Sequence, residues 1–203
     1  ADFIKVFATG GGSTPGTNLF AAQYSEAEMC ALTEEARRLD KRVASHAHGT
    51  PGVLTSIAAR VTTIEHCSFF RPSGTQYEPE HGRRIADAGI YVCPTVFQGR
   101  GKLLVQNPDL PWAAEFRQGQ AERFAVIRCL VEQGIQLVSG SDAGVNFNEF
   151  SDYPGDLILT VEGLDLSPIY VLKSATSIAA EALGRSDLGV IAPGKAADLL
   201  AVQ

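Results

Sequence analysis

The sequence predicts an α/β fold in which helices join the strands of a parallel sheet. Short apolar runs rich in β-branched residues alternate with longer stretches of helical periodicity along the 203-residue chain. Strands separated by helices form βαβ crossovers, and these place the strands parallel. The apolar character of the runs is typical of strands that are covered on both faces. An open doubly wound sheet and part of an eight-stranded barrel both satisfy this pattern.

The expected strands and helices alternate along the chain, without a linker that would divide it into two domains. The first helix has a marked start, with Ser25 as its N-cap and Glu28 as the capping-box partner. The expected strands span residues 3–8, 42–46, 61–66, 90–95, 135–140 and 196–202. The expected helices span about residues 26–39, 53–59, 79–88, 112–133 and 167–183.

Composition excludes several classes of partner. The chain carries 17 basic and 23 acidic residues, a net charge of −6, so it lacks the basic surface that nucleic acids or anionic membranes require. No apolar stretch approaches the roughly 20 residues that span a bilayer. The four cysteines are widely spaced and form no CxxC pair. This spacing favours reduced thiols over a disulfide framework, and we therefore expect a cytoplasmic protein.

Polar residues gather at the carboxyl ends of the expected strands. His46 and His48 end the second strand, His66 the third, Thr95 the fourth and Asp142 the fifth. In a parallel barrel this face carries the active site, and imidazole with carboxylate suits a zinc-type ion. A lone buried histidine is more often a hydrogen-bonded core residue, and Asp142 also fits an ordinary turn. The histidines on neighbouring strands favour the metal site jointly.

A lysine, a histidine and a glycine run also stand out in the sequence. Lys5 stands in an apolar run, so we expect it to be buried and to need a partner or a changed charge state. His81 opens a charged helix and is expected on the solvated surface. The run Gly10–Gly12 lacks the spacing of a phosphate-binding loop, so we expect a flexible active-site loop.

Several ordered motifs together resemble the amidohydrolase superfamily, in its imidazolonepropionase-like and Xaa-Pro dipeptidase (prolidase)-type branch. The motifs lie at residues 3–11, 45–49, 63–67, 140–144, 175–184 and 189–199, and the resemblance covers essentially the whole chain. It implies a partial (β/α)8 TIM barrel, strands four to eight, over residues 1–190. It also implies that residues 191–203 start an accessory β-sandwich.

The resemblance implies a role for each site residue. Lys5 matches the strand-four lysine that carbon dioxide carboxylates and that bridges two metals. His46 and His66 match the strand-five and strand-six ligands. Asp142 matches the strand-eight aspartate, which binds metal and takes a proton from water. His48 is expected to contact the substrate or the tetrahedral intermediate. One or two divalent ions are implied, with zinc as the default.

The family's first strand carries a His-x-His pair, and no such pair precedes Lys5 here. Two functions therefore stay open. One is a metal-dependent hydrolase of C–N bonds, acting on a dipeptide or a cyclic amide and present as a C-terminal portion. The other is a half-barrel that binds at most one metal and pairs with itself or with a complementing N-terminal segment. An open nucleotide-binding domain lacks any phosphate-loop pattern. Arg71, Tyr91 and Arg100 are candidates for meeting a substrate carboxylate, although loop arginines are usually solvated.

Overall fold

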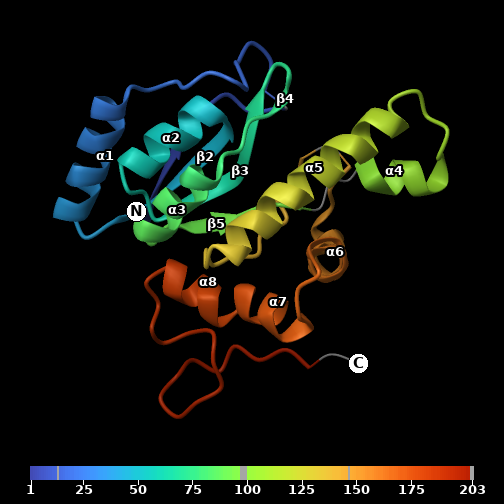
Figure 1. Cartoon of the computed structure of the whole chain (residues 1–203). Coiled ribbons are helices and arrows are strands. Elements are labelled where there is room, and N and C mark those ends of the chain that lie inside the picture. The colour runs from blue at the N-terminus through green and yellow to red at the C-terminus, as the bar shows by residue number, and fades with distance from the viewer. Residues whose placement is uncertain (13, 97–99, 146, 202–203) are drawn as a thin grey trace.

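A computed structural model describes residues 1–12, 14–96, 100–145 and 147–201, without the side chains of Arg100 and Leu103. Its centre is a sheet in the N-terminal half of the chain (Figure 1). The parallel neighbours in the sheet are, in order, β1 (Phe3–Phe7), β2 (Arg42–Gly49), β3 (Thr63–Arg71) and β5 (Tyr91–Cys93), and β4 (Gly74–Thr75) folds back antiparallel on the end of β3. The predicted α/β class with a parallel sheet is confirmed.

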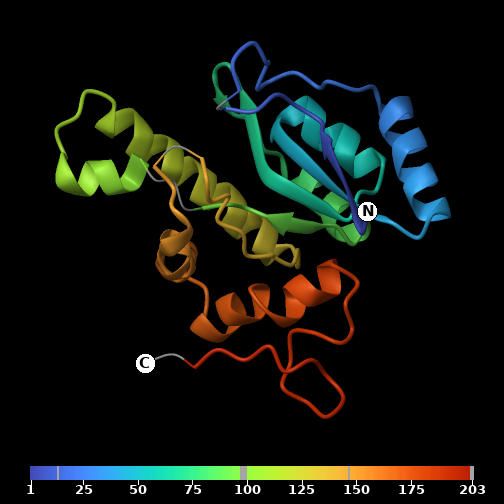
Figure 2. The ribbon, with the colours of Figure 1, turned by 180° about the vertical axis from the view of Figure 1, so that it is seen from behind.

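The helices form two groups around this sheet. Figures 1 and 2 show α1 to α3 beside the strands, α5 running obliquely next to the sheet, and α6 to α8 gathered toward the C-terminal end. The bounds are α1 (Glu26–Arg38), α2 (Thr50–Ala58), α3 (Pro79–Asp87), α4 (Arg100–Gln106), α5 (Ala113–Glu132), η1 (Phe150–Asp152), α6 (Tyr153–Leu164), α7 (Pro168–Ser174) and α8 (Ser177–Ala182). The sequence did not predict α4 or α6.

The core lies between the sheet and its helices. Ile64 of β3 and Val92 of β5 are paired in register and fully buried. Val53 of α2 and Leu130 of α5 are also fully buried in this core. Each such aliphatic side chain stabilises the fold by about 1.5–3 kcal/mol relative to an exposed one. This packing fixes the strands whose carboxyl ends carry the polar residues.

The start of α1 confirms the predicted capping box. The Ser25 side chain accepts a hydrogen bond from the Glu28 amide at 3.3 Å, and the Glu28 carboxylate accepts one from the Ser25 amide at 2.8 Å. Met29 and Ala36 then face the core at helical spacing.

The strand expected at residues 135–140 is wrong as an extended element, because only Leu137 forms a bridge, with Val92 of β5. Val92 and the segment exchange two hydrogen bonds, Val92 N to Gln136 O at 3.1 Å and Val138 N to Val92 O at 2.9 Å. The next donor along the ladder would be Pro94, which has no N–H. The pairing therefore stops after one residue; on the other side of the segment, Ser139 N donates to Ser174 O at 3.0 Å.

The C-terminal elements also differ from the prediction. The helix expected at 167–183 is divided into α7 and α8, because Thr176 adopts a non-helical conformation with φ −130° and ψ −92°. The last strand, expected at 196–202, is absent over residues 196–201, while residue 202 lies outside the described part. Leu199 and Leu200 are exposed there and have no strand to pair with among the described residues. Among those residues, no helix combines the length and apolarity needed to cross a bilayer.

Candidate metal centre

Three of the chain's four histidines converge near the carboxyl end of β2 and within β3, which runs on to Arg71 beyond the predicted end at His66. His46 and His48 are alternate residues of β2, so their side chains leave the same face of the strand. Register pairs His46 with Glu65 and Ala47 with His66. In a regular ladder His66 would therefore share the face of Ala47 and point away from His46.

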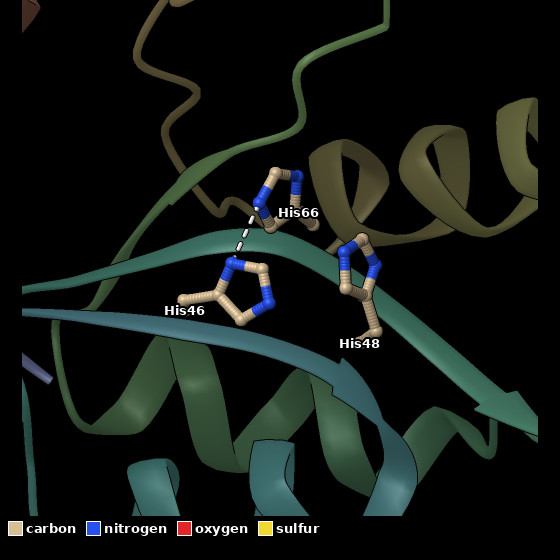
Figure 3. A group of neighbouring side chains, drawn as sticks. All are labelled: His46, His48 and His66. Atoms are coloured by element: carbon tan, nitrogen blue, oxygen red, sulfur yellow. Dashed lines mark hydrogen bonds between the residues drawn. The ribbon is translucent and has the colours of Figure 1, made fainter. Parts of the chain in front are cut away.

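An irregularity in β3 brings His66 to the same face. The pairing of β2 with β3 shifts register after Ala47, and His66 and Cys67 adopt left-handed conformations with φ of 68° and 47°. Such values are unusual for residues other than glycine. The turn in the backbone directs the His66 ring toward His46, and their Nε2 and Nδ1 atoms lie 3.0 Å apart (Figure 3).

The three imidazoles form a compact cluster. One ring nitrogen from each of His46, His48 and His66 lies within 4.8 Å of the other two, and this group could hold a metal ion. The rings of His48 and His66 are stacked, with centroids 4.2 Å apart, and His46 stands nearly edge-on to both. Figure 3 shows the three rings directed into the same space above the strands.

Other polar atoms orient each ring. His46 Nε2 lies 3.3 Å from the Gly10 carbonyl, so the glycine run packs against the cluster. His48 Nδ1 lies 3.0 Å from Ser68 Oγ, and His66 Nδ1 lies 2.8 Å from Thr95 Oγ1. Metal-binding histidines commonly use their second nitrogen in this way, because the contact fixes the ring and its tautomer. These contacts fit a cation held by imidazole lone pairs.

The surroundings keep all three histidines neutral. Burial lowers the pKa of His46, although the contact with Gly10 acts in the opposite direction. Burial is the main cause that lowers the pKa of His48 to about 3, and the neighbouring His46 and Arg123 act in the same direction. Burial and the same neighbours hold the pKa of His66 far below its ordinary value. Neutral imidazole is the form that binds metals, so the donor set suits a divalent ion near pH 7.

Lys5 is not buried as expected. It is solvent-exposed, and its Nζ lies 5.8 Å from the centre of the Phe7 ring on the same face of β1. Lys5 and Phe7 point to the open face of β1, whereas Val6 points to the opposite face and is buried in the core. The Phe7 ring in turn packs against His46, with centroids 4.8 Å apart, which sets Lys5 beside the cluster.

Asp142 lies in an irregular segment and outside the cluster of three. It adopts a left-handed conformation with φ 56° and is exposed to solvent. Partial burial nevertheless raises the pKa of its carboxyl group, and the nearby His46 and Lys5 oppose that rise. Asp142 is not part of the cluster that His46, His48 and His66 form.

The remaining residues singled out in the sequence lie outside the cluster or outside the described part of the chain. Tyr91 opens β5, and burial with the nearby Glu181 carboxylate raises the pKa of its hydroxyl. Arg71 is exposed at the end of β3, and the Arg100 side chain lies outside the described part of the chain. His81 is buried, which corrects the expectation of a solvated surface residue.

The burial of His81 has a local cause in α3. Its Nδ1 accepts a hydrogen bond from the Glu78 amide at 3.2 Å, which completes a capping box. Its ring stacks on Phe69, with centroids 5.5 Å apart. His81 is thus a structural histidine that lies outside the cluster.

Sequence reasoning missed Arg123, a buried cation behind the cluster. It donates to the Pro94 carbonyl and, at 3.2 Å, to Thr95 Oγ1. A signal was present in the sequence, because Arg123 shares the helical stripe of Ile127 and Leu130, which faces the core. A charged residue in such a stripe needs a polar partner inside the protein.

Buried thiols nearby offer no alternative nucleophile. Burial raises the pKa of Cys67 and Cys93 well above the ordinary value, and the Glu65 carboxylate adds to the effect at Cys93. The thiolate is the reactive form of cysteine, so both residues are inert at neutral pH.

Comparison with known proteins supplies the family. The family model described as "Amidohydrolase family" matches residues 1–203. Ochratoxinase of Aspergillus niger is 27% identical over 210 residues, which cover 100% of this chain and 41% of the relative. Imidazolonepropionase of Nocardia farcinica is 33% identical over 158 residues, covering 78% of this chain and 39% of the relative.

Solved structures agree with these sequences. A prolidase solved with N-methylphosphonate-L-proline superimposes with a TM-score of 0.78 at 26% identity, covering 98% of this chain and 47% of the other. A Xaa-Pro dipeptidase with bound methionine gives a TM-score of 0.77 at 27% identity, covering 97% and 47%. The chain thus spans less than half the length of these relatives. On its sequence and its fold, it belongs to the amidohydrolase family.

Proposed function

We propose that this chain is the metal-binding portion of an amidohydrolase that hydrolyses a C–N bond. The observation that carries the proposal is the cluster of neutral imidazoles on adjacent parallel strands, where their regular pairing ends, with ligand atoms within 4.8 Å of one another. In parallel α/β proteins the carboxyl edge of the sheet carries the active site. Membership of the family supports the same reaction class.

His46 and His66 are the proposed ligands, through the nitrogens that face each other at 3.0 Å. When a divalent cation is bound, with zinc as the default, it would lower the pKa of a water molecule and polarise the scissile carbonyl. His48 lies beside both rings and is proposed to contact the substrate. Lys5 is proposed to become a carboxylated ligand, which its exposure to dissolved carbon dioxide supports.

Asp142 is proposed as a further ligand and as the proton acceptor of the reaction. The raised pKa of its carboxyl group, caused by partial burial, brings its basicity closer to that of a general base. Asp142 adopts a left-handed backbone conformation in the segment that follows the bridge at Leu137.

The proposed substrate is a small molecule with an amide bond, either a dipeptide or a cyclic amide. Proteins named prolidase, imidazolonepropionase and ochratoxinase are among the relatives, and this range supports the bond type more than any one compound. The exposed Arg71, at the carboxyl end of β3, is the described arginine that we retain as a candidate for a substrate carboxylate.

A second candidate function is a catalytically incomplete half-barrel that binds at most one metal. The exposure of Lys5 and the position of Asp142 outside the cluster favour it for the chain taken alone. The proposed complement is an N-terminal segment or a second copy, which would cover the open face of β1 where Phe7 is 49% exposed. We propose that residues 1–190 form the partial barrel, strands four to eight, and that residues 191–203 start an accessory segment.

The first test is elemental analysis of the chain after incubation with zinc and bicarbonate and then dialysis. Retention of about one ion per chain is expected, and assays against Xaa-Pro dipeptides and cyclic amides follow. His46→Ala and His66→Ala should lose the ion, whereas His81→Asn, which changes the histidine outside the cluster, should keep it. A chain that retains no zinc would refute the proposed site, and zinc without turnover would favour the half-barrel.

A further inference from the structure

One buried amide closes the segment that carries Asp142. Of the described residues between 141 and 150, only Asn148 is buried, with 3% of its surface exposed. Its side-chain nitrogen donates to the Ser141 carbonyl at 2.5 Å. Because a carbonyl oxygen only accepts, the nitrogen and not the oxygen of the amide faces Ser141. The carbonyl that Asn148 holds belongs to the peptide bond that leads into Asp142.

The backbone of Asn148 closes the same segment a second time. Its N–H donates to Val145 O at 3.1 Å, and its carbonyl accepts from Gly144 N at 2.9 Å. Together with the side chain, these bonds attach Asn148 to the segment at three points. The neighbouring Phe147 and Phe150 are 55% and 82% exposed, so apolar burial of these two side chains does little to hold the segment.

Asp142 needs such an anchor because its backbone is strained. Its φ is 56°, in the left-handed region, which residues with a Cβ adopt at a cost in free energy. Asp40 and Asp165 adopt similar values next to helix ends. Asp142 lies in a non-helical stretch between α5 and η1, so a helix end does not account for its conformation. The hydrogen bond from Asn148 to the preceding carbonyl does.

Stability alone does not explain an amide at this position. Its Oδ1 is buried and has no hydrogen-bond partner among the described residues. A buried polar atom without a partner offsets much of what one hydrogen bond contributes, so an apolar side chain of the same shape would stabilise the core about as well. What the amide of Asn148 adds is a donor at one defined place, the carbonyl of Ser141.

We propose that Asn148 is a positioning residue of the reaction, which acts through the Ser141 carbonyl to hold Asp142 in the left-handed conformation that it uses as proton acceptor. The inference rests on the proposed function for the role of Asp142. Its structural part is the coupling between the Asn148 side chain and the backbone of Asp142, and this coupling can be measured without metal or substrate.

The first test is a double-mutant cycle in urea unfolding of the metal-free 203-residue chain. Asn148→Leu keeps the branched shape of the side chain, removes the donor and adds no charge. Asp142→Gly lets residue 142 adopt a positive φ without strain, whereas Asp142→Ala removes the same carboxylate but keeps a Cβ. Asp165→Gly is the matched control, because Asp165 is also left-handed, with φ 54°, but caps the end of α6.

The effect of Asn148→Leu should depend on what stands at position 142. We expect it to raise the unfolding equilibrium constant by a factor at least about 3 times larger in the parent, Asp142→Ala and Asp165→Gly chains than in Asp142→Gly. The packing of the leucine is the same in every background, so it cancels in this comparison. If Asn148→Leu does not fold, Asn148→Ala takes its place.

The second readout is the NMR signature of Asp142 itself. The coupling between its amide and α hydrogens, with the carbon-13 shifts of its Cα and Cβ, reports its backbone conformation. Asn148→Leu should move these values away from the left-handed range, and Asn148→Gln, which keeps a donor on a longer side chain, should retain them in part. A residue that only stabilised the fold would change the unfolding constant and leave this signature unchanged.

Equal effects of Asn148→Leu in the Asp142→Ala and Asp142→Gly chains, or a left-handed Asp142 in Asn148→Leu, would overturn the inference. In a chain that hydrolyses a Xaa-Pro dipeptide, Asn148→Leu should lower kcat by about 10- to 100-fold, the usual cost of misplacing a reacting group, and an unchanged kcat would also overturn it. A parent chain without zinc binding or turnover would refute the proposed function instead. The unfolding and NMR readouts need neither, so the two failures are distinguishable.

Discussion

Removal of His66 distinguishes a metal ligand from a histidine that merely fills the core. In the metal-free chain, His66→Ala deletes the contacts with Thr95 Oγ1 at 2.8 Å and His46 Nδ1 at 3.0 Å. Thr95 keeps its bonds to Pro94 and Arg123, but His46 Nδ1 loses the partner that His66 provides. Leaving one buried polar atom unpaired costs about 1–3 kcal/mol, so the unfolding free energy should fall by about that amount.

Zinc changes the difference in unfolding free energy between the parent chain and His66→Ala, because it stabilises only the folded state that binds it. At a zinc concentration 100 times the dissociation constant, the parent chain should gain about 2.7 kcal/mol of unfolding free energy. If losing His66 weakens binding about 100-fold, the same concentration equals the new dissociation constant, and the gain falls to about 0.4 kcal/mol. The zinc-dependent difference between the two chains is then about 2.3 kcal/mol, on top of the metal-free difference.

The assay is urea unfolding followed by circular dichroism, with a chelator present for the metal-free curve and then with excess zinc. His81→Asn is the matched control, since His81 is buried like His66 but lies outside the cluster. It should lose stability in both conditions and keep the whole zinc increment. A His66→Ala chain that gains as much from zinc as the parent would refute the ligand role, and His66 would then be a core histidine.

Three other predictions follow from the same contacts. Gly49→Ala should destabilise the chain by about 1–3 kcal/mol in urea unfolding, because a Cβ there would overlap the Phe20 carbonyl. Gly119→Ala is the control: its Cβ would lie in open space on a helix, so it should stabilise the chain by up to about 1 kcal/mol. Because the pKa of His48 is depressed to about 3 in the folded chain, the unfolded chain binds more protons between about pH 6.5 and 3; His48 alone should lower stability by about 1.4 kcal/mol per unit as the pH drops through that window, in addition to the other buried histidines, and His48→Gln should reduce the slope by that amount. Zinc retention should decrease when carbon dioxide is purged, and Lys5→Ala should remove this dependence; equal retention in both gases would argue against a carboxylated lysine.

Local chemistry made much of the fold predictable. The capping box of Ser25 and Glu28 depends on residues three apart, and the apolar runs of β1, β2 and β3 depend on burial by nearby helices. The strand expected at 135–140 failed for a non-local reason, because Pro94 in the neighbouring strand removes the donor that the ladder needs. Similarly, the exposure of Lys5 follows from the face of β1 that none of the described helices covers, which a run of apolar neighbours does not reveal.

The candidate site was predictable in its residue types and less so in its geometry. His46 and His66 could be named because both stand near strand ends. Simple alternation would have set His66 on the face opposite His46, and only the register shift after Ala47 brings the rings together. Arg123 lies 28 residues beyond Thr95 in the chain, so no local sequence pattern connects the two.

The distribution of left-handed residues shows why the site escapes simple strand rules. Asp40 and Asp165 adopt positive φ next to helix ends, where a chain commonly reverses direction. His66 lies within β3, and Thr95 and Asp142 lie in the segments that follow β5 and Leu137; their φ values are 68°, 47° and 56°. Each such residue costs of order 1–3 kcal/mol unless its surroundings compensate, so regular strands would be the more stable solution for packing alone. Regular strands would, however, send alternate side chains to opposite faces. His66 shows what the strain does: its left-handed turn brings its ring to the face of β2 that carries His46 and His48, which packing alone does not require.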